Sequence, residues 1–360
     1  MEAVLELSLG RYRAGDVLER SRRSLPAQTL FGAILGATVE LLRGCGEDPG
    51  TVGEVVEGLV EGLELSDAFP VGEGGEPLLP VPEHLRRLLS DREWYGRVLR
   101  ELEEGARPET HELAREPERV PLSLFLSLCV EDVEPTAMRK ELGRLFGGDG
   151  VRPVVGRAQV THAAVPRTGE DTTPFTVDYA SGRAVGGPTH VAFLRFEGEL
   201  PGYDPEELLG AVVRYLRDVG LGGARSRGAG EVLAARLRGP EGGERRVFSQ
   251  RGSVEEGAPA VTLSACRPVG DVEFYGRVER RGLHYARVGP YVTDFRVPRC
   301  YLAGTGAYFP EWRGAEHVRF KVPRGLLPGF LREDPMYRDG YELVVYGRGF
   351  PVRVRGVEGV

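Results

Sequence analysis

The sequence has almost no lysine and no closely spaced cysteines. Lys140 and Lys321 are its only lysines, although lysine and arginine together number 47. The four cysteines are scattered, with no C-x-x-C pair and no histidine at ligand spacing. This distribution argues against a disulfide framework or a clustered zinc site, and it is typical of a reducing cytoplasm. We therefore predict a cytoplasmic protein that holds neither a metal nor a cofactor.

Long apolar runs are also missing. None approaches the roughly 20 residues that a membrane helix requires. The N-terminal stretch "MEAVLELSLGRYR" is too acidic and too poor in apolar residues for a signal peptide, so we expect no association with a membrane. A chain of 360 residues is long enough for two ordinary domains with buried cores.

Charge is distributed unevenly along the chain. The formal net charge is −7, and residues 54–118 are rich in glutamate, so the protein as a whole is not a basic polyanion binder. Arginine suits bidentate contacts with phosphate, but a general compositional bias toward Arg, Gly and Glu is the more ordinary explanation of its abundance. The arginines nevertheless cluster near the N-terminus, at Arg11, Arg13, Arg20, Arg22 and Arg23.

A strand and then a helix are predicted at the N-terminus. Residues 3–9 alternate between apolar and polar, as in a half-buried strand. A helix is predicted from Pro26 to Gly44. Gly32 and Gly36 lie four residues apart in it and lower its stability, so we expect the helix backbone to pack closely against a sheet there.

The next two segments differ in composition. Residues 48–150 are acidic and mostly helical in pattern, and we predict an insertion or an elaborated crossover, rather than a separate catalytic unit, with its charge facing solvent. Residues 151–185 are rich in Thr, Pro, Gly and charge. Such a segment cannot bury much apolar area, so a protruding β-hairpin arm is predicted there.

A strand, a capped helix and a glycine-rich loop follow the arm. The strand is predicted at residues 189–200. Asp204 is a good N-cap, Pro205 suits the first turn and Gly220 suits the end of the helix. After the loop, residues 231–237 predict another strand.

This order of elements predicts the fold. A strand and a helix, then a strand, a helix and a final strand, follow the order of a ferredoxin-like unit with an insertion. Further strands continue to the C-terminus. The predicted class is α+β, with two ferredoxin-like (RRM-like, βαββαβ) domains at 1–240 and 241–360. The first carries an acidic helical insertion at about 48–150 and a β-hairpin arm at about 151–185.

The glycine-rich loop "GLGGARSRGAGE" spans residues 220–231. Glycine lets a backbone approach a ligand closely, and successive N–H groups can bind an anion. A dinucleotide-binding G-x-G-x-x-G precedes a helix, whereas this loop follows a helix and enters a strand. A P-loop requires a lysine, and none is present. Both of these nucleotide-binding loops are therefore disfavoured.

A helix, this loop and a strand in succession resemble the RAMP superfamily of CRISPR-associated proteins. The opening "LSLGRYRAGDVLERSRRSLPAQTLFGAI" resembles that of the Csm complex subunit four family, with Gln28 in place of the usual acidic residue before "TLF". The segments "PAVTLSACRP", "YLAGTGAYF" and "VVYGRGFPVRV" resemble the second half of that family. The matching segments span nearly the whole chain.

The resemblance implies a function. Members of the family are non-catalytic subunits of the type III-A CRISPR (Csm) interference complex, and they are built from ferredoxin-like folds. The family binds the repeat-derived 5′ handle of the crRNA and caps one end of the filament. Its expected protein partners are the large polymerase-like subunit and the neighbouring backbone RAMP subunit. The alternatives are the equivalent subunit of another type III subtype and a metal-independent endoribonuclease that processes precursor crRNA.

The resemblance also implies RNA-binding residues. In the loop, backbone amides would approach phosphates and two arginines would add charge-assisted contacts; the alternative is a tight connection whose arginines face solvent. The N-terminal arginines and the arm are further candidates, against a solvated surface. The predicted residues are Gly222, Gly223, Arg225, Ser226, Arg227, Gly228 and Gly230 in the loop, Arg11, Arg13, Arg22 and Arg23 near the N-terminus, and Arg157, His162 and Arg167 in the arm.

A nuclease would need an acid and a base converging on one phosphodiester. His162, His190 and His284 are candidates by position only, and no spacing brings them together. We therefore predict no catalytic residue. Exposed tyrosines such as Tyr12 could stack on bases, although packing is the commoner role.

Overall fold

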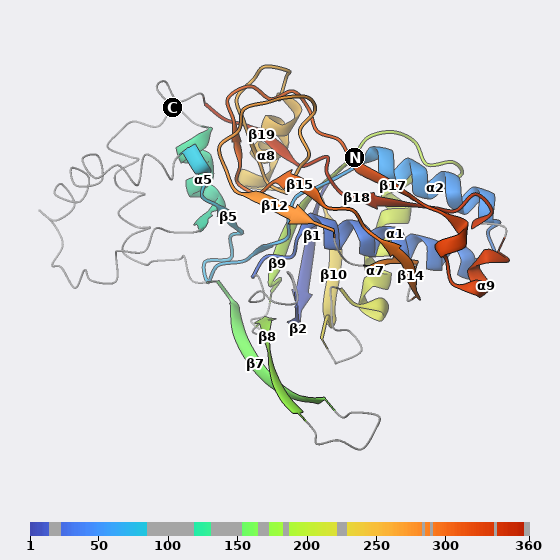
Figure 1. Cartoon of the computed structure of the whole chain (residues 1–360). Helices are drawn as coiled ribbons and strands as arrows, with labels where there is room; N and C mark the ends of the chain where they lie inside the picture. The colour runs from blue at the N-terminus through green and yellow to red at the C-terminus, as the bar shows by residue number, and fades with distance from the viewer. Residues whose placement is uncertain are drawn as a thin grey trace, which may run out of the picture.

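The computed structural model describes residues 1–13, 23–84, 119–130, 153–164, 173–182, 187–221, 229–282, 285–288, 291–334 and 337–355. The chain is α+β, with a body of packed helices and small antiparallel sheets from which one long hairpin projects (Figure 1). In the described residues, no helix is both long enough and apolar enough to cross a membrane.

The main sheet has the strand order β10-β1-β9-β3, and β4 also pairs with β9. Every pairing in it is antiparallel. The helices α1 (Ala27–Gly44) and α7 (Pro205–Val219) connect strands of this sheet, which therefore follows the connectivity of one βαββαβ unit. The strands are β1 (Glu2–Leu9), β3 (Leu63–Leu65), β4 (Phe69–Pro70), β9 (His190–Phe196) and β10 (Val232–Arg238).

Alternation along β1 separates the two faces of this sheet. Leu5 and Leu7 are fully buried with α1 and α7 on one face, while Val4 packs with Phe193 on the other. The predicted helix bounds hold at α7, because the Asp204 carboxylate accepts from the amides of Glu206 and Glu207. The sheet is thus covered on both sides, by helices on one face and by the C-terminal half of the chain on the other.

The start of the segment expected to be an insertion belongs to this main unit. Helix α2 (Pro49–Gly62) packs against α1, and β3 and β4 extend the sheet. Val52, Val55 and Leu59 of α2 are fully buried, so this stretch contributes to the core of the main unit. Beyond it, β5 (Leu78–Pro80) pairs with β6 (Arg119–Pro121), and α5 (Leu122–Cys129) follows.

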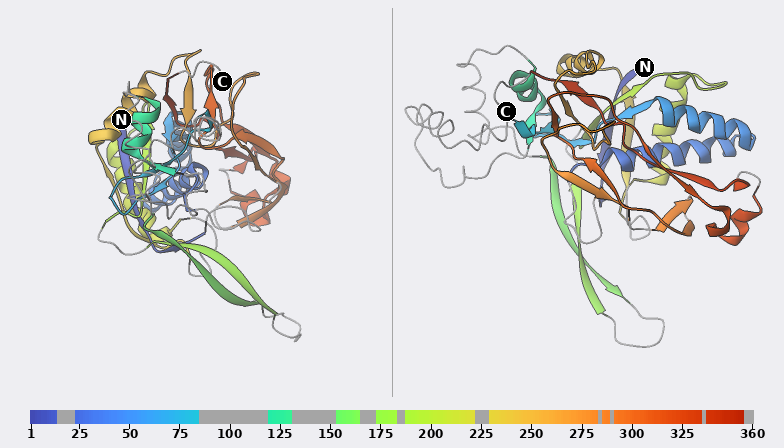
Figure 2. Two further views of the ribbon diagram at one scale, coloured as in Figure 1. Left: turned by 90° about the vertical axis from the view of Figure 1, so that its left-hand side faces the viewer. Right: turned by 45° about the horizontal axis from the view of Figure 1, so that its top comes forward.

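The projecting hairpin consists of β7 (Val155–Ala164) and β8 (Thr173–Gly182), which pair along their whole length. A hairpin arm was predicted at this place, and both views in Figure 2 show it extending well away from the body. At its base, the two-residue strand β2 (Arg11–Tyr12) pairs with β8.

The C-terminal half forms several small antiparallel sheets. A second ferredoxin-like domain is not confirmed, because the described strands after residue 240 do not join into one four-stranded sheet. The elements are α8 (Gly242–Gly252), the sheet of β11 (Ala260–Thr262), β16 (Tyr308–Phe309) and β19 (Pro351–Arg353), the pair β12 (Val278–Arg281) and β15 (Cys300–Ala303), the pair β13 (Tyr285–Val288) and β14 (Tyr291–Arg296), the pair β17 (Val318–Val322) and β18 (Tyr341–Val345), the 3-10 turn η3 (Arg324–Leu326) and α9 (Gly329–Arg332).

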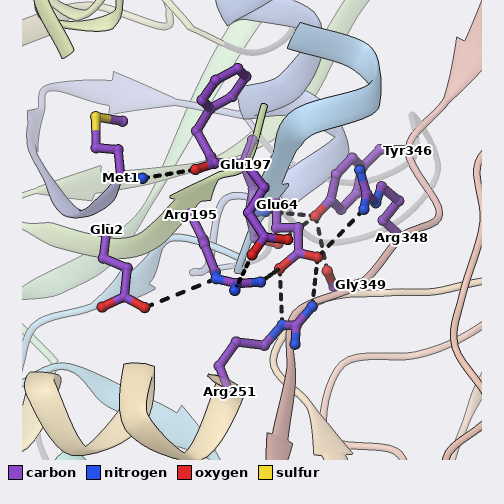
Figure 3. A network of polar contacts seen from close by, with 11 residues as sticks. Met1, Glu2, Glu64, Arg195, Glu197, Arg251, Tyr346, Arg348 and Gly349 are labelled. Carbon is purple, nitrogen blue, oxygen red and sulfur yellow. Dashed lines mark hydrogen bonds and ion pairs between the residues drawn. The ribbon is translucent and has the colours of Figure 1, made fainter. Parts of the chain in front are cut away.

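A charged cluster joins the two halves (Figure 3). Glu64 of β3, whose side chain is 7% exposed, accepts two hydrogen bonds from the guanidinium of Arg251 on α8, at 2.9 and 2.6 Å. Arg195 of β9 and Arg348 near the C-terminus each lie 3.7 Å from the same carboxylate. Gln28 adds a second link, because its side-chain oxygen accepts from the amide of Tyr346.

Candidate nucleic-acid interface

The short strand β2 is the meeting point of segments that are far apart in the sequence. Arg11 and Tyr12 pair with Ser181 and Ala180 at the base of the arm. The Arg11 carbonyl also accepts a 2.7 Å hydrogen bond from the amide of Gly230, at the end of the glycine-rich loop. The arm, the loop and the arginine-rich N-terminal segment therefore share one scaffold.

The glycine-rich loop is anchored at its two ends. The Leu221 amide donates to the Gly230 carbonyl at 2.8 Å, which closes the stem of the loop. Gly220 and Gly230 have φ values of 72° and 84°, in the region that favours glycine. Ala229 is buried against Val177 and Tyr179 of the arm. Residues 222–228 lie outside the described part of the chain.

The arginine-rich segment is also held at both ends. The Tyr12 hydroxyl donates to the Arg23 carbonyl at 2.5 Å. His190 Nε2 lies 2.9 Å from the same carbonyl and 2.8 Å from the Tyr12 hydroxyl. These contacts use only the backbone of Arg23, whose side chain is exposed. The guanidinium of Arg23 is thus presented from a fixed backbone position.

His190 serves this anchor as a neutral group. A carbonyl oxygen can only accept, so Nε2 carries a hydrogen, and Nδ1 faces the Thr189 hydroxyl at 2.9 Å. Burial lowers the pKa of His190 to about 4, because the charged imidazolium would lose its hydration. Tyr12 is fully buried as well, and burial raises the pKa of its hydroxyl. Of the two roles considered for Tyr12, packing rather than stacking on bases is therefore the one that the structure shows.

Several predicted residues converge at this junction, and others do not. Arg11, Arg23 and Gly230 meet there, and Arg13 directly follows β2. In the arm, Arg157 pairs with Ala180, which also pairs with Tyr12, whereas His162 pairs with Phe175 farther out. The predicted residues outside the described part of the chain are Arg22, Arg167, Gly222, Gly223, Arg225, Ser226, Arg227 and Gly228.

Sequence reasoning missed the residues that hold the junction together. Thr189 was predicted only as part of a strand, and His190 was considered only as a possible catalytic group. Tyr179 supports Arg11, whose guanidinium lies 5.1 Å from the centroid of the Tyr179 ring. The one local signal for Tyr12 was an aromatic residue between arginines in "GRYR". That pattern is too common to indicate a buried anchor.

His84 and His317 are also neutral and packed. The ring of His84 packs at a tilt against that of Tyr308, with centroids 4.3 Å apart, and His317 Nε2 lies 2.9 Å from the Val60 carbonyl. Burial lowers the pKa of each to about 4. Within the described ranges, no group of three or more His, Cys, Asp or Glu side chains is arranged to hold a metal ion.

Comparison with solved structures gives matches that span the chain. A chain of the Csm1-Csm4 cassette in complex with cA4 has a TM-score of 0.49 and 17% identity, and the match covers 100% of both chains. A chain of the Csm3-Csm4 subcomplex in the type III-A CRISPR-Cas interference complex has a TM-score of 0.48 and 12% identity, covering 98% of this chain and 99% of that one. The protein resembles subunits of type III CRISPR complexes.

A third match is more distant. A chain of the type III-B Cmr-beta complex bound to cognate target RNA and AMPPnP has a TM-score of 0.42 and 11% identity, covering 86% of this chain and 85% of that one. At these identities and TM-scores, the likeness by itself assigns no function to this chain. No family model matches the sequence, and no curated protein matches it.

Proposed function

We propose that this protein is a non-catalytic RNA-binding subunit of a type III-A CRISPR (Csm) effector complex. It binds the repeat-derived 5′ handle of the crRNA and caps one end of the filament, beside the large polymerase-like subunit and the backbone RAMP subunit. In this proposal the chain comprises two ferredoxin-like domains, at 1–240 and 241–360. The connectivity of the main sheet supports the first of them.

The observation that carries the proposal is the convergence on β2. One two-residue strand joins the arm, the end of the glycine-rich loop and the arginine-rich segment. Arginine side chains and loop amides beside one another suit a phosphate backbone, because both donate to anionic oxygens. The anchoring of Arg23 by Tyr12 and His190 lowers the entropy lost when its guanidinium binds.

A non-catalytic role is supported by the state of His84, His190 and His317. A general base must reach the proton that it abstracts. His84 and His190 are at most 1% exposed, and His317 is hydrogen-bonded to backbone. Their side chains pack and position the backbone instead.

The test is RNA binding by the purified protein, measured by fluorescence anisotropy. The probe is an RNA carrying the repeat-derived 5′ handle, with a scrambled RNA of equal length as reference. Arg23→Ala is expected to weaken binding about tenfold, as expected for the loss of one charge-assisted hydrogen bond. The plot of log affinity against log salt concentration should also become shallower, by about 0.7 in slope. Arg225→Ala combined with Arg227→Ala should act in the same direction.

Arg245→Ala is the matched control, because Arg245 is exposed on α8, which lies at the opposite end of the body from the arm (Figures 1 and 2). It should leave the affinity unchanged. Equal binding of the handle and scrambled RNAs would overturn handle recognition. Site-specific cleavage of repeat RNA would overturn the non-catalytic role, and failure to copurify with a polymerase-like subunit would overturn the assembly.

A further inference from the structure

The ribbon of β12 and β15 carries an exposed surface that the junction does not explain. Arg280 of β12 is paired with Tyr301 of β15, and Val278 lies two residues before Arg280. Because side chains alternate along a strand, these residues share one face of the ribbon. Val278 is 56% exposed and Tyr301 is 54% exposed, so this face is open. Both belong to the small set of large exposed hydrophobic residues in the described ranges.

The opposite face of the ribbon is anchored to the body. Leu302 is 2% exposed and packs with Val318 and Val345. A Cβ atom on Gly304 would lie 2.9 Å from the Arg277 carbonyl, and one on Gly276 would lie 2.8 Å from the Ala307 Cβ. Such close backbone approaches leave the ribbon little freedom. Tyr301 and Arg280 are therefore held in place by the strands rather than by their own contacts.

The ribbon also carries unneutralised positive charge. Arg277, Arg280 and Arg299 are exposed, and none of them forms an ion pair with any other residue that the structure describes. By contrast, Arg319 on the neighbouring β17 contacts three carboxylates, those of Glu57, Glu61 and Glu342. Arginines that form no ion pair, beside an open aromatic ring, complement a polyanion that has planar bases.

The ribbon adjoins the arginine-rich segment of the junction. Thr305, just beyond β15, donates a 2.7 Å hydrogen bond to the Asp67 carboxylate. The other oxygen of Asp67 accepts from the Ala27 amide at 2.8 Å, four residues after Arg23. These two hydrogen bonds tie the end of β15 to the start of α1, close in sequence to Arg23.

We propose that the outer face of β12–β15 is a second contact surface for single-stranded RNA, on which a base stacks on Tyr301 while Arg280 and Arg299 contact the flanking phosphates. This inference rests on the proposed function and extends it to a site in the C-terminal half. Stacking on an aromatic ring is tolerant of base identity, since every base has a π-face. The surface would thus add affinity without sequence preference.

The experiment compares Tyr301→Ala, Tyr301→Phe and the pair Arg280→Ala with Arg299→Ala, using an RNA that extends past the 5′ handle. Tyr301→Ala should weaken binding about tenfold, whereas Tyr301→Phe, which keeps the ring, should retain it. The double arginine variant should make the slope of log affinity against log salt concentration shallower by about 1.4, at about 0.7 for each phosphate contact. With 5-iodouridine in the RNA, photocrosslinking should map to Tyr301.

Phe330→Ala is the matched aromatic control, because Phe330 is 55% exposed on α9; it should leave RNA affinity unchanged. Weaker binding by Arg23→Ala together with unchanged binding by Tyr301→Ala would overturn this inference alone. A wild-type protein that binds no RNA would overturn it together with the proposed function. Unchanged RNA affinity with loss of a copurifying subunit in Tyr301→Ala would assign the face to a protein partner and overturn the inference.

Discussion

The charged cluster around Glu64 gives a prediction whose size can be worked out from the structure. Glu64→Gln keeps the shape of the side chain but removes the negative charge that faces Arg251, Arg195 and Arg348. Removal of one partner from a buried ion pair typically costs about 3–5 kcal/mol, because the remaining charge stays desolvated. The side chains of these arginines are 16–26% exposed and keep some hydration. We therefore expect a loss at the lower end, about 3 kcal/mol.

The assay is thermal unfolding followed by circular dichroism. At roughly 2 °C for each kcal/mol in a protein of this size, the melting temperature should fall by about 6 °C. Glu64→Gln combined with Arg251→Gln should recover at least half of that loss, because the most closely paired charge is then removed as well. Recovery would show that the uncompensated guanidinium causes the loss.

Glu57→Gln is the control for this prediction. Glu57 contacts Arg319 at 3.0 Å, but its side chain is 56% exposed, and Arg319 keeps two further carboxylates. An exposed pair contributes less than about 1 kcal/mol, so the melting temperature should change little. If Glu64→Gln changed it as little as Glu57→Gln does, the cluster would not join the two halves energetically.

Three further predictions concern single residues. Burial raises the pKa of Asp67 from 3.8 to about 6, so the folded state favours the protonated form more than the unfolded state does. The stability that this protonation contributes is complete below pH 4 and is lost as pH rises through 6. The loss is about 3 kcal/mol, at about 1.4 kcal/mol for each pKa unit. Asp67→Asn should remove this part of the pH dependence in urea unfolding measured from pH 4 to 7, and an unchanged profile would contradict it. Gly36→Ala should raise the melting temperature, because a Cβ atom there meets nothing within 4 Å and alanine favours a helix by about 1 kcal/mol; a lower melting temperature would contradict this. Gly182→Ala should destabilise the base of the arm, since its Cβ would overlap the Leu9 carbonyl, and limited proteolysis that stayed unchanged within residues 153–182 would refute it.

The confirmed predictions concern elements whose position depends on residues close together in the sequence. Helix α7 follows from Asp204, Pro205 and Gly220, whose capping and helix-ending roles depend on neighbouring backbone alone. Strand β1 follows from alternation, which places Leu5, Leu7 and Leu9 on one face, although the C-terminal half of the chain buries its other face as well. The expectation for Gly32 and Gly36 was wrong: both are exposed, and no side-chain or backbone atom outside their own helix turns lies near them. Spacing on a helix does not tell which of its faces meets the sheet.

The sequence alone determined that the N-terminal half follows a βαββαβ order, with a long hairpin after an acidic stretch and a glycine-rich loop between a helix and a strand. These features depend on periodicity and turn chemistry within short windows. Only the tertiary structure decided that Arg11, Ser181 and Gly230 meet on β2. A strand of two residues has no periodicity, and its partners are chosen by backbone hydrogen bonds that any side chain allows. The open face of Tyr301 and Arg280 likewise depends on which side of the ribbon the body covers, and that is settled by packing between segments far apart in the chain.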